Sequence, residues 1–167
     1  MAKKPSLLDL SNVDFDNVLL TQEDIRKYNP HRYEMELLTG IVYEDNENSL
    51  YVAYQDVTDQ AFWYRGHMPG FPLMPGVLIC ETAAQVASCY ATKDNYLTSG
   101  VVGLGGLDNV KFRGIVRPGD RLVVIVKICK VRHKMMQIVF EAVVNGDVIA
   151  EGEIKGVAIP TETPEKK

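Results

Sequence analysis

The chain has 167 residues, of which 46% are hydrophobic and 24% are charged, and its formal net charge is −4. These values indicate one globular domain with a sizeable core, and they give no reason to expect nucleic acid as a partner. No apolar run reaches membrane-spanning length, and Ser6–Leu10 is too short for a secretory signal.

The three cysteines, Cys80, Cys89 and Cys129, lie in apolar runs without CxxC spacing. We therefore expect buried free thiols and a cytoplasmic location.

The N-terminal part of the sequence predicts an extension, a short helix and two strands. Residues 1–20 have a mixed pattern and are interpreted as an extension. Thr21 is a suitable N-cap for a short helix that Asn29-Pro30 ends. The runs Tyr33–Tyr43 and Ser49–Val57 are typical of strands, and they flank a polar turn.

A loop rich in glycine and proline precedes the most apolar helix of the chain. The loop is expected from about Thr58 to Pro75, and the helix from Val77 to Ala91, where no Gly or Pro interrupts it. Glu81, Gln85 and Ser88 are spaced i, i+4 and i+7, so these polar residues should lie along one stripe of a buried helix.

The C-terminal half of the sequence predicts strands. These are Val101–Phe112, Leu122–Val131, Met135–Val144 and Asp147–Ala158, with Asn145-Gly146 as the turn of a hairpin. One long helix and about six mostly antiparallel strands give an α+β domain, with the helix packed on one face of the sheet. We expect this domain over residues 21–158, followed by a polar tail at 159–167.

Two residues next to the start of the long helix suggest proton transfer beside a carbonyl group. Burial would raise the pKa of Glu81, which favours a neutral acid able to donate a proton near pH 7. His67 lies in the adjacent loop and could act as a base. The free N–H groups at Pro75-Gly76 could stabilise a developing enolate oxygen. The alternatives are a capping or solvent-exposed glutamate, a bystander histidine and a simple helix start.

Other candidates are weaker. His31 follows Asn29-Pro30 at a helix exit, where a structural role is favoured, and His133 lies between Arg132 and Lys134. Three well-separated histidines do not predict a metal site. The glycines at 103–106 precede a strand rather than open a helix, so they form no dinucleotide fingerprint. The sequence therefore predicts neither a metal nor another cofactor.

Positive charge is concentrated in one segment. Between Lys111 and Lys134 there are eight Lys or Arg residues and one acid, Asp120. The segment is either a solvated basic face or a surface for an acidic or phosphorylated partner.

Four segments resemble the β-hydroxyacyl-acyl carrier protein dehydratases of the FabZ type. They are Asn29–Tyr33 (NPHRY), His67–Gln85 (HMPGFPLMPGVLICETAAQ), Asp108–Arg113 (DNVKFR) and Val116–Asp120 (VRPGD). The resemblance extends over roughly residues 21–158 and implies the hotdog fold, in which an antiparallel sheet wraps round one long central helix.

The resemblance also implies a reaction and the residues that perform it. His67 would remove the α-proton of a (3R)-3-hydroxyacyl thioester, and the Gly76 N–H would hold the thioester oxygen. Glu81, positioned with the help of Gln85, would protonate the hydroxyl and expel it as water, which leaves the trans-2-enoyl product of fatty acid biosynthesis. In this family the two catalytic residues come from opposite subunits of a homodimer, which often assembles into a hexamer.

The acidic partner implied by the resemblance is the acyl carrier protein with its phosphopantetheine arm. The candidate docking residues are Lys111, Arg113, Arg117, Arg121, Lys130 and Arg132. Three other functions remain open for the same fold: a thioesterase, an enoyl-CoA hydratase and a non-catalytic acyl-binding paralogue. The pair His67 and Glu81 argues against the last of these, because a binding protein does not need a buried glutamate.

Overall fold

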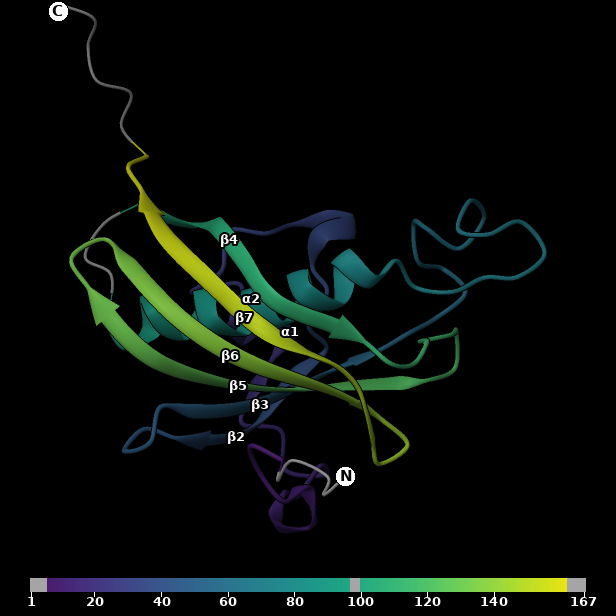
Figure 1. The fold of residues 1–167 in the computed structure, drawn as a ribbon, viewed down its shortest axis with the longest axis horizontal. Helices are drawn as coiled ribbons and strands as arrows, with labels where there is room; N and C mark the ends of the chain where they lie inside the picture. The colour runs from purple at the N-terminus through teal and green to yellow at the C-terminus, as the bar shows by residue number, and fades with distance from the viewer. Residues whose placement is uncertain (1–5, 97–99, 162–167) are drawn as a thin grey trace, which may run out of the picture.

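The structure is a computed structural model that describes residues 6–96 and 100–161. Its main feature is one antiparallel sheet that wraps round a long helix (Figure 1). In this part of the chain the sheet has seven strands in the order β1-β2-β3-β5-β6-β7-β4. The strands are β1 (Leu20–Thr21), β2 (Gly40–Asp45), β3 (Leu50–Asp56), β4 (Val101–Phe112), β5 (Arg121–Arg132), β6 (Met135–Val144) and β7 (Asp147–Ile159). The helices are α1 (Gln22–Ile25) and α2 (Gly76–Lys93), with 3-10 turns at Leu10–Asn12 and Tyr33–Met35.

The central helix α2 confirms the predicted helix and is slightly longer at both ends. Its apolar residues pack on the inner face of the sheet, where the core includes Ile79, Val86 and Phe140. Near its C-terminal end, the Tyr90 ring stacks on Tyr51 of β3, with ring centroids 3.5 Å apart. A helix that is apolar nearly all round is stable only when it is covered on most sides, and the curved sheet provides this cover.

The local turn and cap signals in the sequence are confirmed. Thr21 and Asp24 form a capping box at the start of α1, in which the Thr21 side chain accepts from the Asp24 N–H. Asn145 and Gly146 have φ values of 51° and 84° between β6 and β7, as a type I′ turn requires.

The predicted strand from Tyr33 to Tyr43 is wrong in its first half. The chain forms a 3-10 turn at Tyr33–Met35, and β2 begins only at Gly40. Leu37 and Leu38 are both buried, so alternation between two faces is lost there. The Leu37 N–H donates to the Gln85 side chain at 3.2 Å, so this segment is bound to α2 rather than to a neighbouring strand.

The N-terminal segment covers the outer face of the sheet. Leu7, Leu10 and Phe15 pack on a second apolar cluster formed by β2, β3, β5 and β6. The N-terminal segment, drawn in purple, lies below β2 in Figure 1. The carboxylate of buried Glu141 accepts hydrogen bonds from the Ser6 hydroxyl (2.6 Å) and the Leu7 N–H (3.0 Å). We call residues 6–15 the N-terminal strap.

Two of the three cysteines are buried as expected, and the expectation for the third is wrong. Cys80 and Cys89 are buried on α2, whereas Cys129 is exposed. The register of β5 on β6 shifts between Ile128 and Lys130, so Cys129 is the extra residue of a bulge.

In the described part of the chain, no helix combines the length and hydropathy needed to cross a bilayer.

These environments predict different thiol reactivities. Burial raises the pKa of Cys80 to about 11 and that of Cys89 to about 12, so neither forms a thiolate readily near pH 8. We expect a thiol reagent at pH 8 to modify one cysteine rapidly in the native protein and all three after denaturation. Cys129→Ser should abolish the rapid phase; a rapid phase that persists in this variant would contradict the assignment.

Candidate active site

A narrow pocket lies between α2 and the strands β4, β6 and β7. Glu81, Gln85 and Ser88 line it from one face of the helix, which confirms the predicted polar stripe. The opposite walls are small or apolar and come from Val102, Gly103, Leu104, Ile138, Ile154 and Gly156. One carboxylate at the end of an apolar slot is suited to a ligand with a polar head and a hydrocarbon chain.

The Glu81 carboxylate is held by two neighbours. Its Oε1 accepts from Gln85 Nε2 at 2.9 Å and lies 3.4 Å from His31 Nε2. Burial acts to raise the pKa of Glu81, but the hydrogen bonds from His31 and Gln85 outweigh it and leave the pKa below its usual value. The expectation of a raised pKa is therefore wrong, because the sequence did not reveal these two donors.

Gln85 is the central connection of the pocket. Its Nε2 donates to the Met35 carbonyl at 2.8 Å as well as to Glu81, and its Oε1 accepts from the Leu37 N–H. Its own backbone carbonyl accepts from Asn29 Nδ2 at 2.8 Å. The buried amide thus joins the helix, the carboxylate and the segment from residue 29 to residue 37.

His67 has a defined tautomer. Its Nδ1 lies 2.8 Å from the Leu73 carbonyl oxygen, which can only accept, so Nδ1 carries the hydrogen when the ring is neutral. The Nε2 lone pair is then available to take a proton. The loop that holds His67 projects beyond the end of the sheet, at the upper right in Figure 1.

Gly76 is the first residue of α2, so its N–H is among those that have no partner within the helix. A Cβ at this position would lie 3.0 Å from Cε1 of Phe112, at the end of β4. Glycine is therefore favoured by the close approach of Phe112 as well as by access to the backbone N–H.

Within the described part of one chain, no hydrogen bond or ion pair joins His67 to Glu81. The pocket that contains Glu81 is lined instead by His31, which comes from the Asn29–Tyr33 segment. The interpretation of His31 as a purely structural residue missed this contact. The only signal in the sequence was its place in a segment on which the resemblance depends.

The six candidate docking residues lie in two groups. Lys111, Arg113, Arg117 and Arg121 are near the end of the sheet from which the His67 loop projects, and Arg117 lies over the Phe71 ring at 4.7 Å. Lys130 and Arg132 are at the opposite end of β5, about 30 Å or more away at about 3.3 Å per strand residue. Arg113 pairs with Glu151 at 2.9 Å, and Arg121 pairs with Asp56 at 2.7 Å.

A long helix wrapped by an antiparallel sheet, with a carboxylate between them, defines a protein of the hotdog-fold class. The structure is similar to a chain of the dehydratase heterocomplex ApeI:P from Xenorhabdus doucetiae, with a TM-score of 0.69 and 16% sequence identity. That similarity covers 82% of this chain and 91% of the other. The PaaI protein of Escherichia coli has a TM-score of 0.55 over 70% of this chain and 80% of its own, at 15% identity. These similarities confirm the predicted fold.

Sequence comparisons identify the family. A profile of the FabA-like domain matches residues 29–153. The chain is 36% identical over 134 residues to the protein of Coxiella burnetii (strain RSA 331 / Henzerling II) named 3-hydroxyacyl-[acyl-carrier-protein] dehydratase FabZ. This match covers 78% of this chain and 94% of the relative. The protein of that name from Polynucleobacter necessarius (strain STIR1) is 35% identical, over 78% of this chain and 87% of its own. The chain belongs to the FabA-like family, which confirms the resemblance.

The Gln85 network predicts a specific loss of stability. In Gln85→Leu the Met35 carbonyl and the Leu37 N–H lose their buried partner, and each such group costs about 1–3 kcal/mol. We expect the free energy of unfolding, measured with urea, to fall by about 2 kcal/mol or more. Gln22→Leu is the matched control, because Gln22 makes one long bond to Leu38 at 3.5 Å. Equal losses in both variants would contradict the assigned role.

The lowered pKa of Glu81 predicts how stability changes with pH. The ionised side chain stabilises the fold above its ordinary pKa of 4.5, and this contribution is lost as the pH falls through the lower native value. We therefore expect Glu81→Gln to be less stable than wild type at pH 7, and the difference to shrink on acidification below pH 4.5. Urea unfolding from pH 3 to pH 7 measures it, and a difference that grows in acid would show a raised pKa.

Proposed function

We propose that this protein dehydrates (3R)-3-hydroxyacyl-acyl carrier protein to the trans-2-enoyl thioester in fatty acid biosynthesis. The observation that carries the proposal is the Glu81 carboxylate, which Gln85 and His31 hold at one end of an apolar pocket. Relatives named as 3-hydroxyacyl-[acyl-carrier-protein] dehydratases align with most of the chain and support the same reaction.

The catalytic roles follow from the chemistry of each group. The free Nε2 of His67 removes the α-proton, and the Gly76 N–H at the positive end of α2 stabilises the enolate oxygen that develops. Glu81 delivers a proton to the 3-hydroxyl group, which leaves as water. Gln85 keeps the Glu81 carboxylate directed into the pocket. We place these four residues in a catalytic domain of residues 21–158.

A second copy of the chain would bring His67 to Glu81. Strand β4 is at the edge of the sheet and pairs only with β7 among the described residues, and Leu104 is 57% exposed on it. Leu104 also lines the Glu81 pocket, so a copy that pairs with this edge lies beside the pocket. Phe71 and Val77 are exposed near His67 and suit a covered surface. We infer a homodimer with shared sites, with a trimer of dimers as the larger alternative.

The substrate carrier is proposed to dock on the basic group beside the His67 loop. Lys111, Arg113, Arg117 and Arg121 could attract an acidic carrier protein to the end of the sheet nearest the reacting atoms. Lys130 and Arg132 form the alternative surface at the other end of β5.

The buried thiols Cys80 and Cys89 and a carrier-bound substrate support a cytoplasmic location.

The test is incubation of the purified protein with 3-hydroxyacyl-acyl carrier protein, in which enoyl absorbance and product mass are followed. We expect enoyl product with the wild type, and a loss of about a hundredfold or more in kcat for both His67→Ala and Glu81→Gln, because each removes a proton-transfer group. Free acid would indicate a thioesterase. Turnover of the CoA thioester alone would indicate a hydratase, and binding without turnover a non-catalytic paralogue.

Mixing the two inactive variants tests the shared site. After unfolding and refolding together, random pairing should restore about a quarter of wild-type activity, because half of the dimers then carry one intact site of two. Each variant refolded alone is the control. No recovery from a mixture that contains heterodimers would place both residues in the site of one chain.

A further inference from the structure

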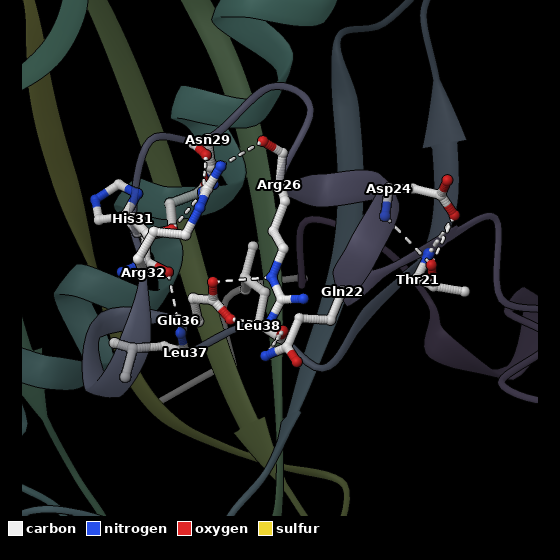
Figure 2. A network of polar contacts seen from close by, with 11 residues as sticks. Thr21, Gln22, Asp24, Arg26, Asn29, His31, Arg32, Glu36, Leu37 and Leu38 are labelled. Atoms are coloured by element: carbon white, nitrogen blue, oxygen red, sulfur yellow. Dashed lines mark hydrogen bonds and ion pairs between the residues drawn. The ribbon is translucent and has the colours of Figure 1, made fainter.

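His31 is held in a fixed position beside Glu81. Figure 2 shows the segment that leads to it, from the Thr21–Asp24 cap to the Arg32 guanidinium. That guanidinium donates to the carbonyls of Asn29 (2.8 Å), His31 (2.6 Å) and Arg26 (3.1 Å). These bonds fix the backbone on both sides of the ring, so the contact of His31 with Glu81 is built into the fold.

His31 contributes to the lining of two cavities. Its Nε2 is 3.4 Å from Glu81 Oε1 in the pocket between α2 and β4. The residue also lines a second, much smaller cavity, together with Asn29, Gln85 and the Arg26–Glu36 pair. The exposed Arg26 forms part of the outer wall of this cavity.

Two of the residues that line the second cavity each have a buried polar atom without a partner in the described part of the chain. These atoms are His31 Nδ1 and Asn29 Oδ1. Buried polar groups nearly always have a hydrogen-bond partner, and a water molecule commonly provides it. We infer that one bound water molecule completes the hydrogen bonds of these two atoms and connects the His31 ring to solvent.

The proposed reaction requires a proton at Glu81 in every cycle. The Glu81 carboxylate is ionised at neutral pH, since its pKa lies below the usual value. The proton that leaves with the hydroxyl group must therefore be supplied to Glu81. A substrate that occupies the pocket would close the direct route from solvent to Glu81. Protonation of Glu81 while the substrate is bound therefore needs a route through the residues that line the pocket.

We propose that His31 is a proton relay, which supplies Glu81 from solvent in the second cavity. In the relay, His31 Nδ1 accepts a proton from solvent, and the Nε2–H bond then breaks as the proton passes to Glu81 Oε1. This leaves a neutral carboxylic acid, which then protonates the leaving hydroxyl, and a neutral ring with its hydrogen on Nδ1. When the product has left, the Nδ1–H proton returns to water and Nε2 takes a proton from water in the pocket, which restores the starting tautomer. A neutral imidazole can take up and release protons at opposite ring nitrogens, whereas an amide cannot. The proposal rests on the dehydratase function; His31 acts through Glu81 and is not itself a catalytic residue.

The charged groups round the ring are compatible with this role. Glu81 on α2 faces Nε2, and the paired Arg26 and Glu36 line the second cavity. The Arg32 guanidinium contacts the backbone of the segment. Among residues 6–96 and 100–161, no charged residue of a β-strand lines either cavity.

The test compares His31→Gln with wild type in the enoyl assay at increasing imidazole concentration. A glutamine Nε2–H can still donate to Glu81, but it cannot relay a proton. We expect kcat of His31→Gln to fall at least about tenfold with KM little changed, and added imidazole to restore it in proportion to concentration. Wild-type kcat should not respond to imidazole. The matched control is His133→Gln, which replaces an exposed histidine on the β5–β6 hairpin.

Each outcome has a defined meaning. Full activity in His31→Gln overturns the relay but leaves the dehydratase proposal intact. A loss that imidazole does not restore, in a variant with unchanged Tm, shows that His31 only positions Glu81 and also overturns the relay. No enoyl product with the wild type overturns both proposals. The larger cavity of His31→Ala should admit imidazole and give stronger rescue than His31→Gln.

Discussion

The arrangement of the site depends on one buried amide, the side chain of Gln85. A helix surrounded by a sheet has few places where a carboxylate can lie, because an ion in an apolar interior needs hydrogen-bond donors. Gln85 supplies one donor to Glu81 and uses its remaining contacts to hold the segment at Met35 and Leu37. That segment carries His31, the second donor. The position of Glu81, its pKa and the walls of both cavities therefore depend on the same side chain.

The two histidines near the proposed chemistry are prepared for different tasks. His67 is fixed through Nδ1 to a carbonyl oxygen, so its other nitrogen is free to act as a base. His31 contacts a carboxylate through Nε2, and its buried Nδ1 has no partner among the described residues. A base that takes a proton from carbon needs one free nitrogen, whereas a relay needs both. The contacts of the two nitrogens in each ring thus determine which role the residue can perform.

Sequence patterns predicted the elements that depend on local chemistry. The helix α2, the Asn145-Gly146 hairpin and the Thr21 cap follow from periodicity, turn preference and capping. The patterns failed where distant residues decide the conformation. Leu37 is not in a strand because its N–H binds a side chain 48 positions away. The lowered pKa of Glu81 depends on His31, which is 50 positions away in sequence, and no spacing rule relates the two.

The N-terminal strap gives the sheet a second buried face, since Leu10 and Phe15 cover apolar side chains such as Val52 and Ile125. The family profile begins only at residue 29, so this cover lies outside the part of the sequence that defines the family. A chain shortened to its region of similarity would expose that apolar surface and leave the Glu141 carboxylate without its two donors. A recombinant chain therefore has to include the N-terminal strap if the outer face of the sheet is to stay covered.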